Sequence, residues 1–131
     1  MSVNASVLVA EDDLATRELL SCLLGGRGYA VVAAASGAEA WECLQGSAPP
    51  RILLLDWHLP DLTGIEICQR LRLDERLAAS YVIILSGDND SESMRGALSA
   101  GANAWLGKPF ELEDLFARLE QGRRELGEAA G

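Results

Sequence analysis

Four groups of reactive side chains each follow a short apolar run in this chain of 131 residues. Carboxylates follow two of the runs, at residues 11–13 (Glu-Asp-Asp) and at Asp56. The hydroxyl of Ser86 and the ammonium of Lys108, the only lysine, follow two others. Converging carboxylates repel one another until a cation or a proton relieves the repulsion. An all-oxygen set of this kind suits magnesium, which readily shares a phosphate with its protein ligands.

The same groups are suited to phosphoryl chemistry. A carboxylate such as Asp56 can act as a nucleophile and form an aspartyl phosphate. The other oxygens of the transferred group then need charge neutralisation, for which magnesium, Lys108 and Ser86 are candidates. Each residue alone also has an ordinary interpretation, such as a turn, a helix cap or a solvated surface. Together, at four strand ends, they favour one common site.

The apolar runs predict the strands that position these groups. Three runs are continuous rather than alternating, which is typical of parallel strands covered on both faces. They occupy residues 7–10, 52–55 and 82–85, with weaker candidates at 29–34 and 104–106. Helical periodicity lies between them, at residues 14–24 (ending in Gly25-Gly26), 38–44, 65–73, 91–100 and, marked by Leu112, Leu115, Phe116 and Leu119, in a last helix.

Strands and helices therefore alternate five times, which predicts an α/β fold. Parallel strands require right-handed crossover helices, so the expected architecture is a three-layer sandwich around a parallel sheet. Ligands of such sheets bind beyond the carboxyl ends of the strands. The reactive groups lie at those ends.

Composition narrows the class of protein. The formal net charge is -9, from 20 acidic against 11 basic side chains, which argues against direct nucleic-acid binding. Hydrophobic residues make up 49%, enough for the core of one domain. No apolar run is long enough to span a membrane, and the three cysteines form no CxxC pair or disulfide framework. We expect a cytoplasmic protein without membrane contact.

Four segments, in this order and spacing, resemble the receiver domain of bacterial two-component response regulators. The resemblance covers about residues 5–121, and its segments are 7–13 (VLVAEDD), 55–60 (LDWHLP) with Gly64, 84–87 (ILSG) and 101–110 (GANAWLGKPF). It implies a doubly wound, flavodoxin-like sheet of strand order 2-1-3-4-5 with five helices. The chain, residues 1–131, is then a single receiver domain, in which 122–131 hold the end of the last helix and a tail or linker.

The resemblance also implies roles for the residues of the site. Asp56 corresponds to the phospho-acceptor. Asp12 and Asp13 correspond to the acidic pair that holds magnesium, directly or through water, together with Asp56 and the main-chain carbonyl of His58. Glu11 is the less certain member of its cluster, and Asp13 has the alternative of capping the first helix.

Further roles follow from the same resemblance. Ser86 and Lys108 each bind a phosphoryl oxygen. The Lys108-Pro109 peptide bond is expected to be cis, and Pro60 and Gly64 are expected to shape the loop after the third strand. His58 and Asp88 occupy the positions that tune loss of the phosphoryl group.

Two features depart from the family pattern. Trp105 stands where a smaller aromatic residue usually turns inward as the serine or threonine moves, so the switch pair is Ser86 and Trp105, with a static surface tryptophan as the alternative. Asn103-Ala104 replaces two acidic residues that often bridge to a partner in receivers attached to winged-helix DNA-binding domains, and this absence argues against that dimer. A homodimer is still one of the expected partners. Residues 118–126 resemble the helical lead-in to diguanylate cyclase or related output domains.

We therefore predict a phosphorylation-switched signalling domain and not a conventional enzyme. It takes a phosphoryl group from a sensor histidine kinase or phosphotransfer protein, and the fourth helix, fifth strand and fifth helix then act on a target or output domain. A degenerate receiver that works without phosphate is one alternative. A haloacid-dehalogenase-type phosphatase would need an acid where His58 stands, and a flavodoxin-like cofactor carrier would need a phosphate loop where the acidic cluster lies.

Overall fold

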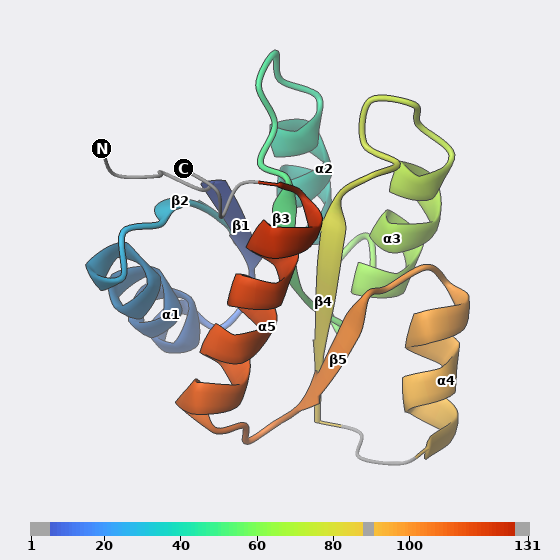
Figure 1. Ribbon diagram of the computed structural model, residues 1–131. Helices are drawn as coiled ribbons and strands as arrows, with labels where there is room; N and C mark the ends of the chain where they lie inside the picture. The colour runs from blue at the N-terminus through green and yellow to red at the C-terminus, as the bar shows by residue number, and fades with distance from the viewer. Residues whose placement is uncertain (1–5, 88–90, 128–131) are drawn as a thin grey trace.

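A parallel five-stranded sheet forms the centre of the computed structural model, which describes residues 6–87 and 91–127 (Figure 1). The strand order is β2-β1-β3-β4-β5, as predicted. The bounds are β1 Ser6–Ala10, β2 Ala30–Ala34, β3 Ile52–Asp56, β4 Tyr81–Ser86 and β5 Ala104–Gly107. The order reverses beside β1, so the carboxyl ends of β1 and β3 flank the position where such folds bind ligands.

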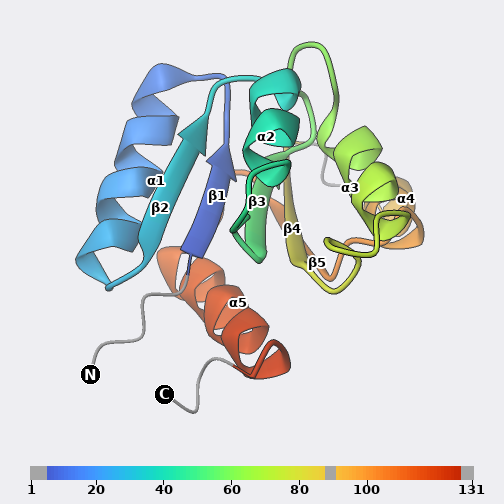
Figure 2. The same ribbon diagram turned by 90° about the horizontal axis from the view of Figure 1, so that it is seen from above.

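Helices cover both faces of the sheet. Within the described residues they are α1 Leu14–Gly26, α2 Gly37–Leu44, α3 Gly64–Arg72, α4 Ser91–Ser99 and α5 Leu112–Glu125. Helices α1 and α5 lie on one face, and α2, α3 and α4 lie on the other (Figures 1 and 2). None of these described helices combines the length and apolar character needed to cross a membrane.

The core explains why the central apolar runs are continuous. Strands β1, β3 and β4 lie inside the sheet, and nearly all of their side chains are buried. Alternate residues pack into two separate clusters, one under α1 and α5 and the other under α2, α3 and α4. The edge strands β2 and β5 are partly exposed, which accounts for their weaker sequence signal.

Helix α1 extends two residues past the predicted range 14–24, whereas α5 ends within residues 122–131, as predicted. Helix α1 ends at Gly26, and Arg27 is its C-cap residue. The following Gly28 has a left-handed φ of 92°. The main-chain N–H of Tyr29 then bonds to the carbonyl of Leu24, an end that glycine permits and most side chains disfavour. Helix α5 continues to Glu125 because Leu115, Leu119 and the buried Gly122 keep its inner face on the sheet.

Candidate functional site

Asp56 is the last residue of β3, and its side chain is only 9% exposed. The chain beside it is held firmly, because the N–H of Trp57 donates to the carbonyl of Leu85 at 2.8 Å. Helix α3 begins directly against it: a Cβ on Gly64 would come within 2.6 Å of the main-chain oxygen of Asp56. Glycine at residue 64 therefore lets the helix approach the carboxylate-bearing strand closely.

Lys108 joins two strands at the site. Its Nζ lies 2.8 Å from Oε1 of Glu11 and 3.3 Å from Oδ2 of Asp56. Burial by itself would lower the pKa of this lysine, but the hydrogen bond to Glu11 and the charges of both carboxylates outweigh it and raise the pKa. The ammonium is thus held in its charged form between two buried acids.

Three carboxylates gather at the ends of β1 and β3. Oxygen atoms of Glu11, Asp12 and Asp56 all lie within 4.8 Å of one another, with Glu11 and Asp56 buried and Asp12 exposed. The strand register explains the grouping, since Ala10 pairs with Leu55 and the next residues of the two strands are the two buried acids. A donor set of hard oxygens with excess negative charge fits a divalent cation such as magnesium.

Asp13 lies outside this group, which differs from the predicted acidic pair of Asp12 and Asp13. Its carboxylate caps α1, accepting hydrogen bonds from the N–H of Thr16 at 2.9 Å and from the Thr16 hydroxyl at 2.6 Å. These bonds lower the pKa of Asp13. The physical reason is that a residue opening a helix turns its side chain toward the exposed N–H groups of the first turn. The pair that faces Asp56 is Glu11 and Asp12.

Ser86 ends β4 and is fully buried. It pairs with Gly107 across the sheet, and its main-chain oxygen accepts the N–H of Lys108 at 2.6 Å. The Lys108-Pro109 peptide bond is cis. The structure therefore brings Asp56, Ser86 and Lys108 to adjacent strand ends, where the sequence predicts them.

Comparison with known proteins agrees with this architecture. Residues 7–120 match the family described as the response regulator receiver domain. This chain belongs to the receiver domain family. It is 31% identical over 115 residues to chemotaxis protein CheY1 of Helicobacter pylori, covering 87% of this chain and 93% of CheY1. It is 40% identical over 119 residues to response regulator MprA of Mycobacterium ulcerans, covering 89% of this chain and 49% of MprA.

Solved structures show the same fold. A response regulator from Chloroflexus aurantiacus has a TM-score of 0.84 and 32% identity, covering 90% of this chain and 96% of that one. Chemotaxis protein CheY4 of Vibrio cholerae has a TM-score of 0.83 and 29% identity, covering 91% and 98%. As a receiver domain, the chain is a signalling domain of two-component systems and not a conventional enzyme. It spans almost all of CheY1 but about half of MprA.

The residues predicted to tune the phosphoryl lifetime are only partly described. His58 is exposed, and its ring stacks on Trp57 with centroids 6.2 Å apart. Asp88 lies outside the described residues. Pro60 holds the receiver's β3–α3 loop against α2, because its carbonyl accepts the N–H of Gly37 at 3.1 Å.

Trp105, which the sequence predicts to be part of the switch, lies on β5. The residue is half-buried and packs against the cluster under α2, α3 and α4. Its Nε1 is buried and has no hydrogen-bond partner within the described part of the chain. Trp105 is therefore only partly exposed, and its Nε1 makes no hydrogen bond to the described residues. Movement of the ring on activation stays a prediction.

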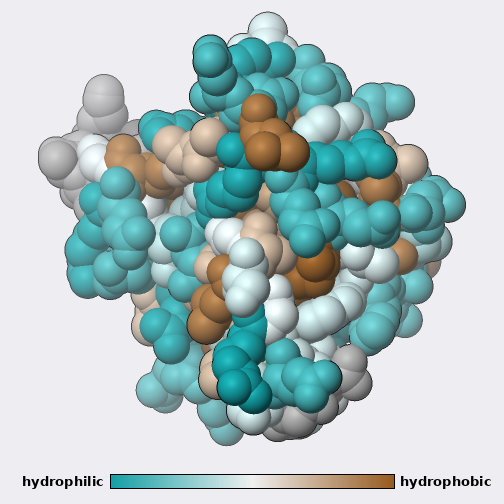
Figure 3. Space-filling model, turned by 90° about the vertical axis from the view of Figure 1, so that its right-hand side faces the viewer, coloured by the Kyte–Doolittle hydropathy of each residue, from teal (hydrophilic) through white to brown (hydrophobic). Residues whose placement is uncertain are grey.

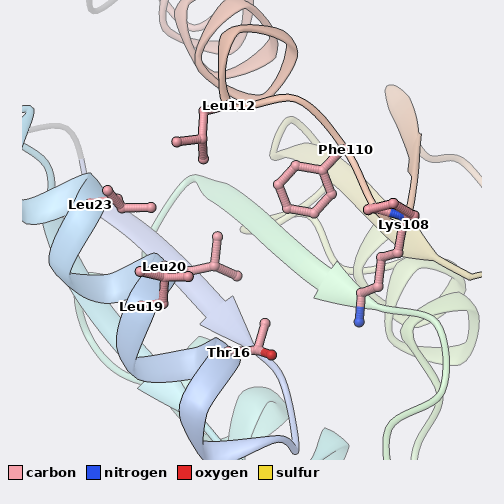
Figure 4. Close-up of a pocket in the computed structure, with 8 residues that line it drawn as sticks. Thr16, Leu19, Leu20, Leu23, Lys108, Phe110 and Leu112 are labelled. Atoms are coloured by element: carbon pink, nitrogen blue, oxygen red, sulfur yellow. The ribbon is translucent and has the colours of Figure 1, made fainter.

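Beside the carboxylates, an apolar groove runs between α1 and the start of α5 (Figure 4). It encloses about 290 Å³ and is lined by Thr16, Leu19, Leu20, Leu23, Lys108, Pro109, Phe110 and Leu112. Lys108 belongs to both regions, because it lines the groove while its ammonium points to the end of β3 (Figure 4). The groove is thus continuous with the site.

The face of the receiver that carries α4 differs from this groove. Apolar patches on it are separated by polar residues (Figure 3). Exposed apolar side chains nearby include Leu73 after α3 and Met94 and Leu98 on α4. Scattered residues of this kind are ordinary on a protein surface and do not define a binding site.

Sequence reasoning gave too little weight to Glu11. The signal was present, since Glu11 directly follows the first apolar run just as Asp56 follows the run 52–55. Two paired parallel strands of equal length end at the same level of the sheet. The residues that directly follow them, Glu11 and Asp56, are therefore expected to be neighbours. The resemblance to the family drew attention to the two aspartates instead, one residue further on.

Proposed function

We propose that this receiver domain accepts a phosphoryl group on Asp56 from a histidine kinase or a histidine phosphotransfer protein. The observation that carries the proposal is the buried Asp56 carboxylate, which lies 3.3 Å from the Lys108 ammonium and beside the acidic pair Glu11 and Asp12. A buried nucleophile flanked by a cation and by ligands for a second cation matches the needs of phosphoryl transfer.

The proposed reaction proceeds by in-line displacement. An Asp56 carboxylate oxygen attacks the phosphorus of a phosphohistidine, the phosphorus–nitrogen bond breaks, and the imidazole leaves with the electron pair and takes up a proton. The product is an acyl phosphate, which water later hydrolyses to aspartate and inorganic phosphate. Lys108 would neutralise charge on the phosphoryl oxygens, since its Nζ lies 3.3 Å from Oδ2 of Asp56. The Ser86 hydroxyl would donate a hydrogen bond to them from the end of β4, the strand next to β3.

Magnesium fits the remaining part of the site. Glu11, Asp12 and Asp56 would hold it, and the main-chain carbonyl of His58 is proposed as a further ligand. When bound, the ion neutralises negative charge on the transferred group. In its absence Lys108 offsets part of the carboxylate charge, through contacts with both Glu11 and Asp56.

We propose that phosphorylation shifts the surface made by α4, β5 and α5. Ser86 supports this role because it is buried at the end of β4 and its main chain is bonded to that of Lys108. Trp105 lies on the neighbouring strand, paired with Ile84. A two-state equilibrium of these elements would control a target protein, an output domain or a second copy of the receiver.

The groove beside Lys108 is proposed to receive the helical domain that carries the donor histidine. Leu19 and Leu112, which line it, are 59% and 43% exposed. A helix laid along these apolar side chains would bring its phosphohistidine to the site, because Lys108 joins the groove to Asp56. The occupant is thus a protein donor, and small phosphodonors would not need the groove.

The acceptor role is tested with magnesium followed by beryllofluoride, a phosphoryl mimic. Tryptophan emission should change with each addition, because Trp57 directly follows Asp56. Asp56→Asn should abolish the beryllofluoride response and the mass increase of one phosphoryl group after incubation with acetyl phosphate. Asp61→Asn is the matched control, since Asp61 is exposed in the same loop and its φ of 72° suits asparagine.

A wild-type protein that takes up no phosphoryl group would contradict the acceptor role and favour an interaction module that works without phosphate. The groove is tested separately with Leu19→Glu, which should slow transfer from a phosphorylated kinase and leave labelling by acetyl phosphate unchanged. Leu73→Glu, 88% exposed at the end of α3, serves as the control. Equal kinase rates for both variants would remove the docking role.

A further inference from the structure

Arg17 of α1 bonds to three successive carbonyl groups of the turn that carries the acidic pair. Its guanidinium Nη1 donates to the main-chain oxygen of Glu11 at 2.8 Å and to that of Asp12 at 3.5 Å. Its own main-chain N–H donates to the carbonyl of Asp13 at 2.9 Å. One half-buried residue therefore spans the whole β1–α1 turn.

Arg17 bonds to two carbonyls, those of Glu11 and Asp12, that lie between the end of β1 and the first turn of α1. The ladder between β1 and β3 ends at Ala10, and the N–H of Glu11 makes the last bond to β2, at Ala34. Helix α1 takes the carbonyl of Asp13 as its first acceptor. The carbonyls of Glu11 and Asp12 lie between strand and helix, where a planar guanidinium can bond to both.

The side chain of Glu11 is also fixed at both oxygens. Oε1 accepts the Lys108 ammonium, and Oε2 accepts the main-chain N–H of Asp13 at 3.2 Å. Arg17 holds the backbone from which this side chain projects. Backbone and carboxylate of the metal-facing acid are thus constrained by different partners.

We propose that Arg17 is a positioning residue for the acidic pair, and that it sets the magnesium affinity of the receiver through the β1–α1 turn. The inference rests on the proposed metal site and goes beyond it, because Arg17 is neither a ligand nor a phosphoryl contact. Residues that orient metal ligands commonly change metal affinity 10–100-fold when they are replaced.

The sign of the effect separates positioning from simple charge. Removing a cation from the turn that carries the acidic pair makes the local potential more negative, which by itself tightens binding of magnesium. Releasing the turn has the opposite effect, because the acidic pair must then be ordered when the ion binds. A variant that binds magnesium more weakly despite its more negative charge therefore reveals positioning.

The experiment compares Arg17→Met with Arg17→Lys and with Arg124→Met by magnesium titration, followed by tryptophan emission and calorimetry. Arg17→Met should weaken magnesium binding about tenfold. Arg17→Lys keeps the charge, loses the two-oxygen contact and should weaken it a few-fold. Arg124→Met removes the same charge from an exposed residue near the end of α5 and should leave the affinity unchanged.

Circular dichroism at the assay temperature establishes that each variant is folded, so that loss of fold is not counted as loss of affinity. If Arg17→Met is unfolded there, Arg17→Lys decides the question alone. Unchanged or tighter binding by the folded Arg17 variants would overturn the positioning role while leaving the acceptor function intact. A wild-type protein without magnesium binding would instead contradict the proposed metal site.

Discussion

Two cations hold the two ends of β5, and they do so with different partners. Lys108, directly after the strand, contacts the carboxylates of Glu11 and Asp56. Arg72, the last residue of α3, lies near the other end and donates to the carbonyls of residues 78, 80 and 101 and to Oδ1 of Asn103. One cation faces charges, and the other faces neutral oxygens.

The two ends of β5 therefore have different properties. We call the end at Lys108 the responsive end and the end at Arg72 the fixed end. Carboxylates change their charge and partners when a metal, a proton or a phosphoryl group arrives, whereas main-chain carbonyls do not. Lysine, a single rotatable ammonium, suits the first task, and the five fixed donors of arginine suit the second. Asn103 belongs to the fixed end, since its Oδ1 also accepts the N–H of Val82 at 2.8 Å.

Lys108→Met should have the largest effect on ligand binding at the responsive end. The variant should lose the beryllofluoride response, since the ammonium that lies 3.3 Å from Asp56 is removed and phosphoryl oxygens lose a charge partner. Its magnesium affinity should rise, because the ion no longer competes with Lys108 for the carboxylates. Paired titrations of the two ligands by tryptophan emission measure both effects. A retained beryllofluoride response would show that Lys108 is not a phosphoryl partner.

Arg72→Met should damage the fixed end and leave the site intact. Five hydrogen bonds to a charged group disappear, leaving part-buried carbonyls without partners, so we expect the free energy of unfolding to fall by about 3 kcal/mol. Magnesium affinity should stay within about twofold, because sites at opposite ends of the sheet are independent. Urea unfolding gives the first quantity and magnesium titration the second.

Arg70→Met is the matched control for that experiment, because Arg70 is exposed on the same helix and its guanidinium lies 5.8 Å from the Trp41 ring. It should cost less than about 1 kcal/mol. A large loss of magnesium affinity in Arg72→Met would mean that the two ends of β5 are coupled, and the division between them would fail.

The two ends also differ in how far the sequence predicts them. Continuous apolar runs predicted a parallel sheet, and strand-end chemistry predicted the meeting of Asp56, Ser86 and Lys108. The strand order came from the resemblance to the receiver family. The Arg72 contacts could not be predicted, since they join α3 to residues up to 31 positions away and no periodicity marks an arginine that binds carbonyls. The sequence did not show that Glu11 and Asp12, rather than Asp12 and Asp13, lie beside Asp56. Asp13 suits a helix cap as well as a metal ligand, and the strand register that brings Glu11 to Asp56 appears only in the fold.

Asp12→Ala and Asp13→Ala test which acids form the metal site. They compare an acid that lies beside Asp56 with a neighbouring acid that caps α1. Asp12 faces the carboxylate group, so its loss should weaken magnesium binding about tenfold. Asp13 bonds to Thr16, so its loss should leave the affinity unchanged and lower Tm by a few degrees. Magnesium titration and thermal melts separate the two outcomes. The reverse result would restore Asp13 to the metal site.

The smallest expected effect is a dependence on alkaline pH that only the responsive end should show. Although burial lowers it, the pKa of Lys108 is raised by Glu11 and Asp56 above its ordinary value of 10.5. Its ion pairs therefore stabilise the folded state fully below pH 10.5, and this contribution disappears as the pH rises through the raised pKa. The bonds that Arg72 makes to neutral oxygens involve no ion pair and should give no such dependence.

Without magnesium, the stability difference between wild type and Lys108→Met should narrow above pH 10.5, whereas the difference from Arg72→Met should stay constant. The change should be under about 1 kcal/mol, because Lys108 is 30% exposed and screened by solvent. Tyr29 and Tyr81, whose pKa values are raised by burial, ionise in all three proteins and cancel in the differences. Parallel curves for wild type and Lys108→Met in urea unfolding would show that the lysine, like Arg72, is a fixed contact, and the contrast between the two ends would then rest on ligand binding alone.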